Sequence, residues 1–393
     1  MKQILAVTAL NLRSLPERVA PSLVIVIGMA GVVAVLIAVL SVSRGLANTL
    51  ASTGKAGRAV LLHADAISEA ASSMTREDVF RILDKPGIAR GPNGKPIYSA
   101  ELLTHVNLPR KGSRTLSSLT LRGVTTSQQP ALRPEIHLVE GRLMYPGLHE
   151  VISGRAAQAR FGNLQVGQRV KLGDTEWTVV GAFESGGDAH EAELFADAET
   201  MLTAYKRVSV NAVTVKMSSP GAFGVLQKAV LDDPTLSVSL SPELVYYQSH
   251  SKVFSRLLAL VAHLIGTVMA VGAIFAALNS MYAIVSARTV EIGTLRAIGF
   301  GAGAVVVSVM VEALVLAVIG AGAGMLVAWV LFNGNTVSTV GGAGIPNVIF
   351  QLRIGAPLIA VGVTWAMFIG LVGGLFPAIR AARLPVVAAL RSV

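Results

Sequence analysis

Four long apolar segments constrain this chain more than any other feature. They cover residues 19–43, 257–287, 302–332 and 354–379, and each reaches the roughly twenty mostly apolar residues that cross a bilayer as a helix. The first is longer than the roughly 7–15 apolar residues of a signal peptide, and no clear cleavage site follows it, so we expect a retained anchor. Hydrophobic residues make up 52% of the chain and mean hydropathy is +0.62, which excludes an ordinary soluble protein.

The distribution of basic residues predicts the topology. With four spans, the N-terminus, residues 288–300 and the C-terminus lie on one side. These parts carry eight basic residues against Glu17 and Glu291: Lys2, Arg13, Arg18, Arg288, Arg296, Arg380, Arg383 and Arg391. Basic residues in short flanks mark the cytoplasm, so both termini are expected there, in a cell inner membrane protein. The net charge of +10 is then a topology signal and not a nucleic-acid-binding surface.

Residues 44–256 form the long outside segment, with a nearly balanced 24 basic and 20 acidic residues. Its pattern mixes strands (58–63, 95–107, 208–217 and 236–240) with helices near 75–83 and 223–231. The stretch 149–184 predicts a strand, a short helix and two strands joined at Gly173-Asp174. We therefore expect an α-helical membrane protein with four transmembrane helices plus an α+β extracytoplasmic domain inserted between the first two, with a subdomain at about 135–205. Residues 242–256 are expected to continue as a helix into the second span.

Charges reappear in the stretch RTVEIGTLRAIGF, residues 288–300, between the second and third apolar segments. On a helix, Arg288, Glu291, Ile292 and Leu295 share one face. That face mixes charge with aliphatic bulk, as a groove on another protein would require, whereas a helix lying on a membrane separates the two. A solvated cytoplasmic turn with a weak Arg288–Glu291 pair is the alternative, and the spacing alone does not decide between them.

The last third of the chain carries three motifs of a known family. SARTVEIGTLRAIGF, preceded by Asn279, resembles the cytoplasmic coupling segment of the MacB/FtsX-like ABC transporter permeases. VEALVLAVIGAGAG resembles the start of that family's third span, and FPAIRAARLPVVAALR resembles its C-terminus. The segment VISGRAAQARFGNLQVGQRVKLGDTEWTVVGAF is more loosely similar to the family's extracytoplasmic core. Ala287 and Val290 stand where the family usually or often has charged residues.

This resemblance implies a function. Such permeases form dimers, homo- or heterodimers, and each copy binds a separate ATP-binding subunit that supplies ATP and Mg²⁺. Force then passes to the outside domain, for export or extraction of a substrate, in some cases with a periplasmic adaptor protein. By resemblance, the contact with the ATPase comprises Arg288, Glu291, Ile292, Gly293, Leu295 and Arg296. An FtsX-like signalling device that regulates an envelope enzyme without transport is the alternative.

The chain is not expected to be an enzyme. A P-loop needs a Gly-rich turn followed by Lys and Ser or Thr, but Gly54-Lys55 leads to Ala56 and Gly94-Lys95 leads to Pro96. The string ESGGD at 184–188 is predicted to be a turn and not an ABC signature. Because no P-loop is found in the sequence, ATP hydrolysis is assigned to a partner. No catalytic constellation stands out, and no bound cofactor or metal is expected.

A few polar and small residues within the spans remain. Glu312 is an acid inside a span and is expected to make a structural bond, although a proton relay is an alternative. Asn279 could bond across helices or be satisfied locally. The pairs Gly320 and Gly324, and Gly370 and Gly374, are spaced for close helix packing.

Two further segments receive weaker predictions. The stretch DAHEAE, 188–193, is expected to be a solvated loop and not a cation site. Residues 1–18 predict an interfacial helix at the surface of the membrane lipids, with an irregular start as the alternative.

Overall fold

The computed structural model describes the chain except residues 1–2, 4–6, 10–18, 114, 339–347 and 386–393, so most of the predicted interfacial helix lies outside the described residues. The chain divides into two compact units. We call residues 1–44, 256–335 and 352–393 the helix unit. Residues 45–255 and 336–351 form the α/β unit.

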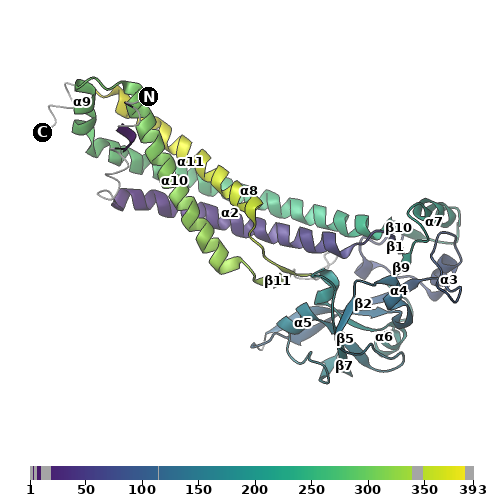
Figure 1. Cartoon of the computed structure of the whole chain (residues 1–393). Helices are drawn as coiled ribbons and strands as arrows, with labels where there is room; N and C mark the ends of the chain where they lie inside the picture. Colours follow the sequence, from purple (N-terminus) through teal and green to yellow (C-terminus); the bar gives the residue numbers. More distant parts are fainter. Residues whose placement is uncertain (1–2, 4–6, 10–18, 114, 339–347, 386–393) are drawn as a thin grey trace. The chain divides into compact units, whose positions relative to one another are not determined.

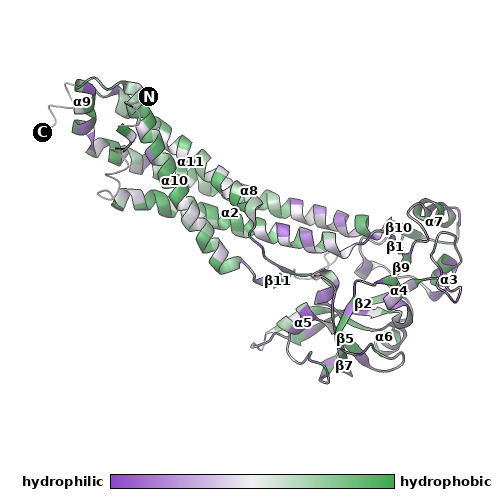
Figure 2. Ribbon diagram, viewed as in Figure 1, coloured by the Kyte–Doolittle hydropathy of each residue, from purple (hydrophilic) through white to green (hydrophobic). Residues whose placement is uncertain are grey.

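Four helices in the described part of the chain are long and apolar enough to cross a membrane. They are α2 (Val19–Thr53), α8 (Glu243–Ala287), α10 (Ala302–Phe332) and α11 (Ala356–Arg383), and a short helix, α9 (Thr289–Ala297), lies between α8 and α10. Figure 2 shows long apolar stretches along the four helices. Both α2 and α8 are longer than the predicted spans, and each contributes residues to both units.

Glycines set how closely the helices of the helix unit pack. A Cβ on Gly324 of α10 would lie 2.4 Å from the backbone oxygen of Ala30 in α2, and one on Gly320 would lie 2.8 Å from that of Val26. On α11, a Cβ on Gly370 or Gly374 would lie 2.7 Å from an alanine Cβ of α10. Because glycine has no side chain, it lets the backbones of neighbouring helices approach closely. These contacts place α10 directly against both α2 and α11.

One mixed sheet organises the α/β unit (Figure 1). Its strands follow the order β10-β1-β9-β2-β3-β8-β5-β7-β4, with β6 paired to β7. The strands are β1 (Arg58–His63), β2 (Tyr98–Pro109), β3 (Leu116–Val124), β4 (His137–Gly141), β5 (Glu150–Gly154), β6 (Arg169–Leu172), β7 (Thr175–Glu184), β8 (Leu194–Asp197), β9 (Ala212–Lys216) and β10 (Val238–Pro242). Between α10 and α11, the described residues add a small hairpin, β11 (Thr336–Ser338) with β12 (Ile349–Gln351).

Short helices connect the strands of the α/β unit. They are η2 (Glu69–Ala71), α3 (Arg76–Leu83), η3 (Thr126–Gln128), α4 (Gln129–Leu132), α5 (Arg155–Arg160), η4 (Ala189–Ala192), α6 (Ala198–Ala204) and α7 (Ala222–Leu231). The helix α3 follows an N-cap at Thr75. The Thr75 side chain accepts from the backbone N–H of Asp78, and the Asp78 side chain accepts from the backbone N–H of Thr75, a reciprocal cap. Gly173 has a positive φ of 65° at the turn between β6 and β7, a conformation that glycine adopts without strain.

The predicted fold class is confirmed: four apolar helices and a mixed α/β domain placed between the first two. Residues 135–205, predicted as a subdomain, contribute β4 to β8 at one end of the same sheet, where β3 pairs with β8 in parallel. The core of this unit includes Trp177, Phe161 and Leu121, all fully buried. The strands of residues 135–205 therefore belong to the same sheet as β1, β2, β3, β9 and β10.

Candidate functional site: the helix α9 and a buried charge cluster

The helix α9 is held to the helix unit by side chains that point inward. Arg288, at its N-cap, is buried, and its Nε donates to Glu291 Oε2 at 2.9 Å. Its Nη1 lies 3.5 Å from Oε2 of Glu312, which is buried in α10. Ile292 is also buried and packs with Ile284 and Val305. The charged pair and the apolar contact together fix α9 against α8 and α10.

The opposite face of α9 is exposed. Val290, Glu291, Thr294, Ala297 and Ile298 are all exposed, and their spacing places them on one side of a helix. Ile298 is 72% exposed, although it is a large aliphatic residue. An exposed face with one acid and three aliphatic side chains suits a protein partner.

The six residues predicted for the ATPase contact therefore divide. Glu291 is exposed, Arg288, Ile292 and Gly293 are buried, and Leu295 and Arg296 are half-buried. Arg296 Nη1 donates to the backbone oxygen of Leu384 at 2.5 Å, beside the end of α11. Within this chain Arg288 and Ile292 are buried and hold α9 in place, and the ATPase contact of the six residues stays a prediction. Helical periodicity gives the faces of a helix but not which of them packs inward.

Two other predicted positions differ in their surroundings. Glu312 is 1% exposed and pairs with Arg288, which corresponds to the structural bond expected for it. Asn279 is exposed on α8, so within one chain it does not reach across the helix bundle.

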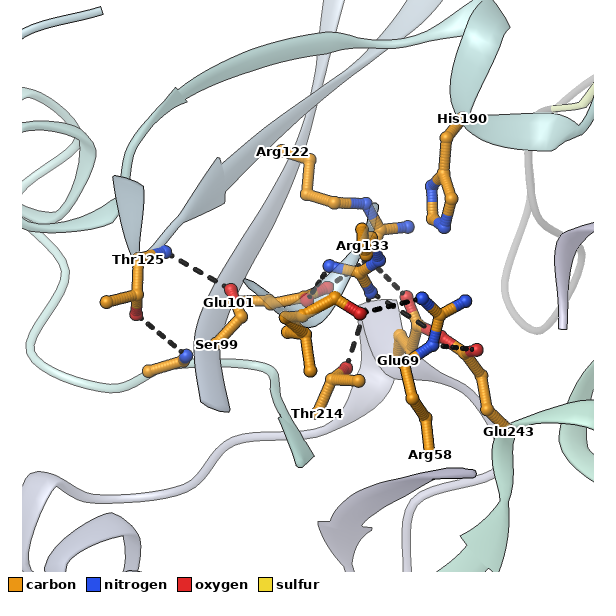
Figure 3. Close-up of polar contacts among 12 residues, drawn as sticks. Arg58, Glu69, Ser99, Glu101, Arg122, Thr125, Arg133, His190, Thr214 and Glu243 are labelled. Carbon is orange, nitrogen blue, oxygen red and sulfur yellow. Dashed lines mark hydrogen bonds and ion pairs between the residues drawn. The ribbon is translucent and has the colours of Figure 1, made fainter. Parts of the chain in front are cut away.

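A second constellation lies inside the α/β unit and was not predicted. Three buried arginines contact four buried glutamates, and we call these seven residues the buried charge cluster: Arg58, Arg122, Arg133, Glu69, Glu101, Glu193 and Glu243. Arg122, on β3, donates to Glu193 at 2.7 Å, to Glu69 at 2.8 Å and to Glu101 at 2.6 Å. Figure 3 labels every member of the cluster except Glu193 and shows the labelled side chains converging from several strands and from the start of α8.

The cluster joins the end of α2 to the beginning of α8. Glu243, the first residue of α8, is fully buried and accepts from Arg58 Nε at 2.6 Å and from the backbone N–H of Lys55 at 3.0 Å. Thr53, the last residue of α2, accepts from the backbone N–H of Ala189 at 2.9 Å. A Cβ on Gly54 would lie only 2.6 Å from Leu244 Cα. Both helix ends are thus fixed at one place on the sheet.

The predicted solvated loop at 188–193 is wrong. Residues 189–192 form the short helix η4, and Asp188 and His190 are buried, as is the adjacent Glu193. His190 Nδ1 lies 3.1 Å from Glu193 Oε2, and the imidazole ring makes edge contacts with Phe195 and Tyr247. The polar sequence suggested solvent, but these groups belong to or adjoin the cluster. Among the described residues, no group of three or more His, Cys, Asp or Glu could hold a metal ion.

The cluster holds the carboxylates of Glu101 and Glu193 in the ionised form. Burial by itself would raise the pKa of Glu101, but the guanidinium groups of Arg133 and Arg122 outweigh it and lower that pKa to about 2. Burial opposes ionisation of Glu193 as well, yet Arg122 and His190 hold its pKa well below the usual range. These carboxylates therefore stay charged at any ordinary pH.

Stability of the α/β unit is expected to fall in acid. The folded-state pKa of Glu101 is about 2 against the ordinary 4.5, so the unfolded chain binds its proton first as the pH drops. The contribution of Glu101, of the order of 3 kcal/mol, is complete above about pH 5 and is lost between pH 4.5 and pH 2. Urea unfolding at stepped pH checks this, with Trp329 and Trp365 replaced by phenylalanine so that Trp177 alone reports. A flat profile from pH 6 to pH 2 would contradict it.

The four apolar helices and the α/β domain define a class of membrane protein, and family models match both parts. The chain is a multi-pass membrane protein with an α/β domain inserted in the sequence between the first two spans. Residues 22–232 match the MacB-like periplasmic core domain, and residues 263–386 match the FtsX-like permease C-terminal domain. The chain belongs to the MacB/FtsX-like family of ABC transporter permeases.

Solved structures with some likeness are remote. The extracellular domain of the noncanonic ABC-type transporter YknZ from Gram-positive bacteria is 15% identical, with 47% of this chain and 99% of that one covered and a TM-score of 0.36. The periplasmic region of MacB from Actinobacillus actinomycetemcomitans is 14% identical, covering 50% and 94% of the two chains, with a TM-score of 0.37. No match was found among curated proteins.

Proposed function

We propose that this chain is the transmembrane subunit of an ABC transporter and receives force from a separate ATP-binding subunit at the exposed face of α9. That subunit binds ATP and Mg²⁺, and its movement drives export or extraction of a substrate at the cell envelope. The permease works as a dimer, with both termini and α9 in the cytoplasm and the α/β unit outside. The basic residues of the two terminal segments and of residues 288–300 support this orientation, because basic residues in short segments mark the cytoplasmic side.

The observation that carries the proposal is that α9 is buried on one face and exposed on the other. Its inward residues bind it to three long helices: Arg288 to Glu312 of α10, Ile292 to the core with α8, and Arg296 to Leu384 beside α11. Its outward face includes Glu291 and Ile298, which are exposed. A partner that pushes on this face moves the helices to which the other face is attached.

Both α2 and α8 then serve as the transmitting elements. Each is a single helix that contributes residues to the helix unit and to the α/β unit. In the α/β unit their ends meet at Glu243, Lys55 and Thr53, beside the buried charge cluster. Displacement of these helices is thereby passed to the sheet through ion pairs and not through a flexible linker.

Reversing the charge of Glu291 is expected to weaken the contact between α9 and the ATP-binding subunit. The variant Glu291→Lys should lose co-purification with the ATP-binding subunit, weakening binding by at least about tenfold, as removal of a well-placed interface charge does. ATP hydrolysis stimulated by the permease should fall in parallel. The measurement is affinity pull-down of the co-expressed subunit together with ATPase activity in nanodiscs.

Glu176→Lys is the matched control, because Glu176 is also an exposed acid paired with an arginine, Arg169, but lies on β7. It should leave both binding and hydrolysis unchanged, and both variants should melt at the temperature of the native protein. If Glu291→Lys bound the ATP-binding subunit as well as the native protein does, the proposed contact at α9 would be contradicted.

A further inference from the structure

A cavity of about 240 Å³ lies within the α/β unit. It is bordered by η3, α4 and residues of β4, β5, β7 and β8, and its walls are mainly apolar: Ile136, Leu138, Met144, Ile152, Phe183 and Phe195. The rings of Phe183 and Phe195 stack at a tilt with centroids 4.9 Å apart. Concave, mostly apolar spaces with a few polar groups are typical of small-molecule sites.

The polar groups of the cavity wall include two that lack partners. Gln129 is 6% exposed, and neither its Oε1 nor its Nε2 has a hydrogen-bond partner. Arg133 uses its terminal nitrogens within the buried charge cluster, but its Nε is unpaired. Buried amide groups are nearly always bonded, so an unbonded one in the wall of a cavity indicates a partner that comes from outside the chain.

Charge selects among possible ligands. The buried charge cluster already contains one more carboxylate than guanidinium groups, and Arg133 belongs to it. A further buried anion would therefore be repelled, and a cation finds no free carboxylate among the described residues that line the cavity. The amide of Gln129 can both donate and accept, which matches an uncharged amide or hydroxyl group.

We propose that this cavity binds a small uncharged amphipathic molecule, with its apolar body against Ile152, Phe183 and Phe195 and an amide or hydroxyl group on Gln129. Binding there does not depend on an ATP-binding subunit. The proposal can thus be tested on the isolated permease. A negative result would not affect the proposed contact between α9 and the ATP-binding subunit.

The absence of cysteine from the sequence allows a direct test. Leu143, 36% exposed, lines the cavity, whereas Leu148, 50% exposed, lies five residues along and does not line it. In nanodiscs, decanamide should slow modification of Leu143→Cys by N-ethylmaleimide at least about tenfold at saturation, and should leave Leu148→Cys within about twofold. Equal slowing at both positions, or none at either, would overturn the proposal.

Two further arms test the polar contact. Gln129→Leu in the Leu143→Cys background keeps a similar volume and should raise the decanamide concentration needed by about tenfold, the effect of about one lost hydrogen bond. Decanoate, the anionic analogue, should protect less well than decanamide. Equal protection by both, or protection unaffected by Gln129→Leu, would overturn the assignment of an uncharged group to Gln129. Should Gln129→Leu fail to fold, the decanoate comparison still decides the point.

Discussion

Replacing Arg122 with methionine is expected to destabilise the α/β unit by about 3–5 kcal/mol, the cost of removing one partner from a buried ion pair. Arg122 donates to Glu193, Glu69 and Glu101, and its guanidinium is buried. Methionine fills part of the space but leaves these carboxylates without their shared cation. Urea unfolding in the background where Trp177 is the sole tryptophan measures the loss.

Arg76→Met is the matched control for Arg122→Met. Arg76 also pairs with a glutamate, Glu199, but both side chains are more than half exposed. Such a surface pair contributes only about 0–1 kcal/mol. If the two variants lost similar stability, or if Arg122→Met stayed within about 1 kcal/mol of the native protein, Arg122 would not be what holds the cluster together.

The second large effect is expected in the helix unit, at Gly324. Valine there would place a Cβ 2.4 Å from the backbone oxygen of Ala30 and 2.9 Å from its Cα. Backbone atoms cannot turn aside as a side chain can, so α10 and α2 must separate. We expect Gly324→Val to cost about 3 kcal/mol, the upper end of the usual overpacking range, measured as lowered thermal stability in detergent.

Gly322→Val provides the control for Gly324→Val. Gly322 lies two residues away on the same helix, and a Cβ there would meet no atom within 4 Å. Both variants change helix propensity equally, so the difference between them isolates the contact with α2. Equal melting temperatures would show that α10 does not pack on α2 at this glycine.

The apolar segments predicted the helix unit well because hydropathy and length determine a membrane span almost by themselves. In the α/β unit, β1 and α3 were predicted because a short apolar run and a threonine at a helix start are local signals. The strand β3 was missed, since LSSLTLRGV contains two serines, a threonine and an arginine and reads as a surface segment. Its last six residues are nevertheless buried, because β3 lies in the middle of the sheet.

The buried charge cluster could not be predicted from sequence spacing. Arg122 and its partner Glu193 are 71 residues apart, and Arg58 and Glu243 are 185 apart. A charged residue in a strand ordinarily indicates solvent, so only the three-dimensional pairing shows that these are interior. One local hint existed: Arg122 follows the alternating Leu119 and Leu121 and precedes Val124, all buried. The exposed face of α9 was equally hidden, because amphipathic spacing does not show which side packs inward.

The close meeting of Thr53, Lys55 and Glu243 has a mechanical consequence. A domain attached at two distant points could be stretched or sheared by moving one anchor against the other. Here the end of α2 and the start of α8 meet at one place within the α/β unit, where Glu243 accepts from the backbone N–H of Lys55 and from Arg58. Loss of the Glu243 carboxylate would therefore loosen both helix ends together.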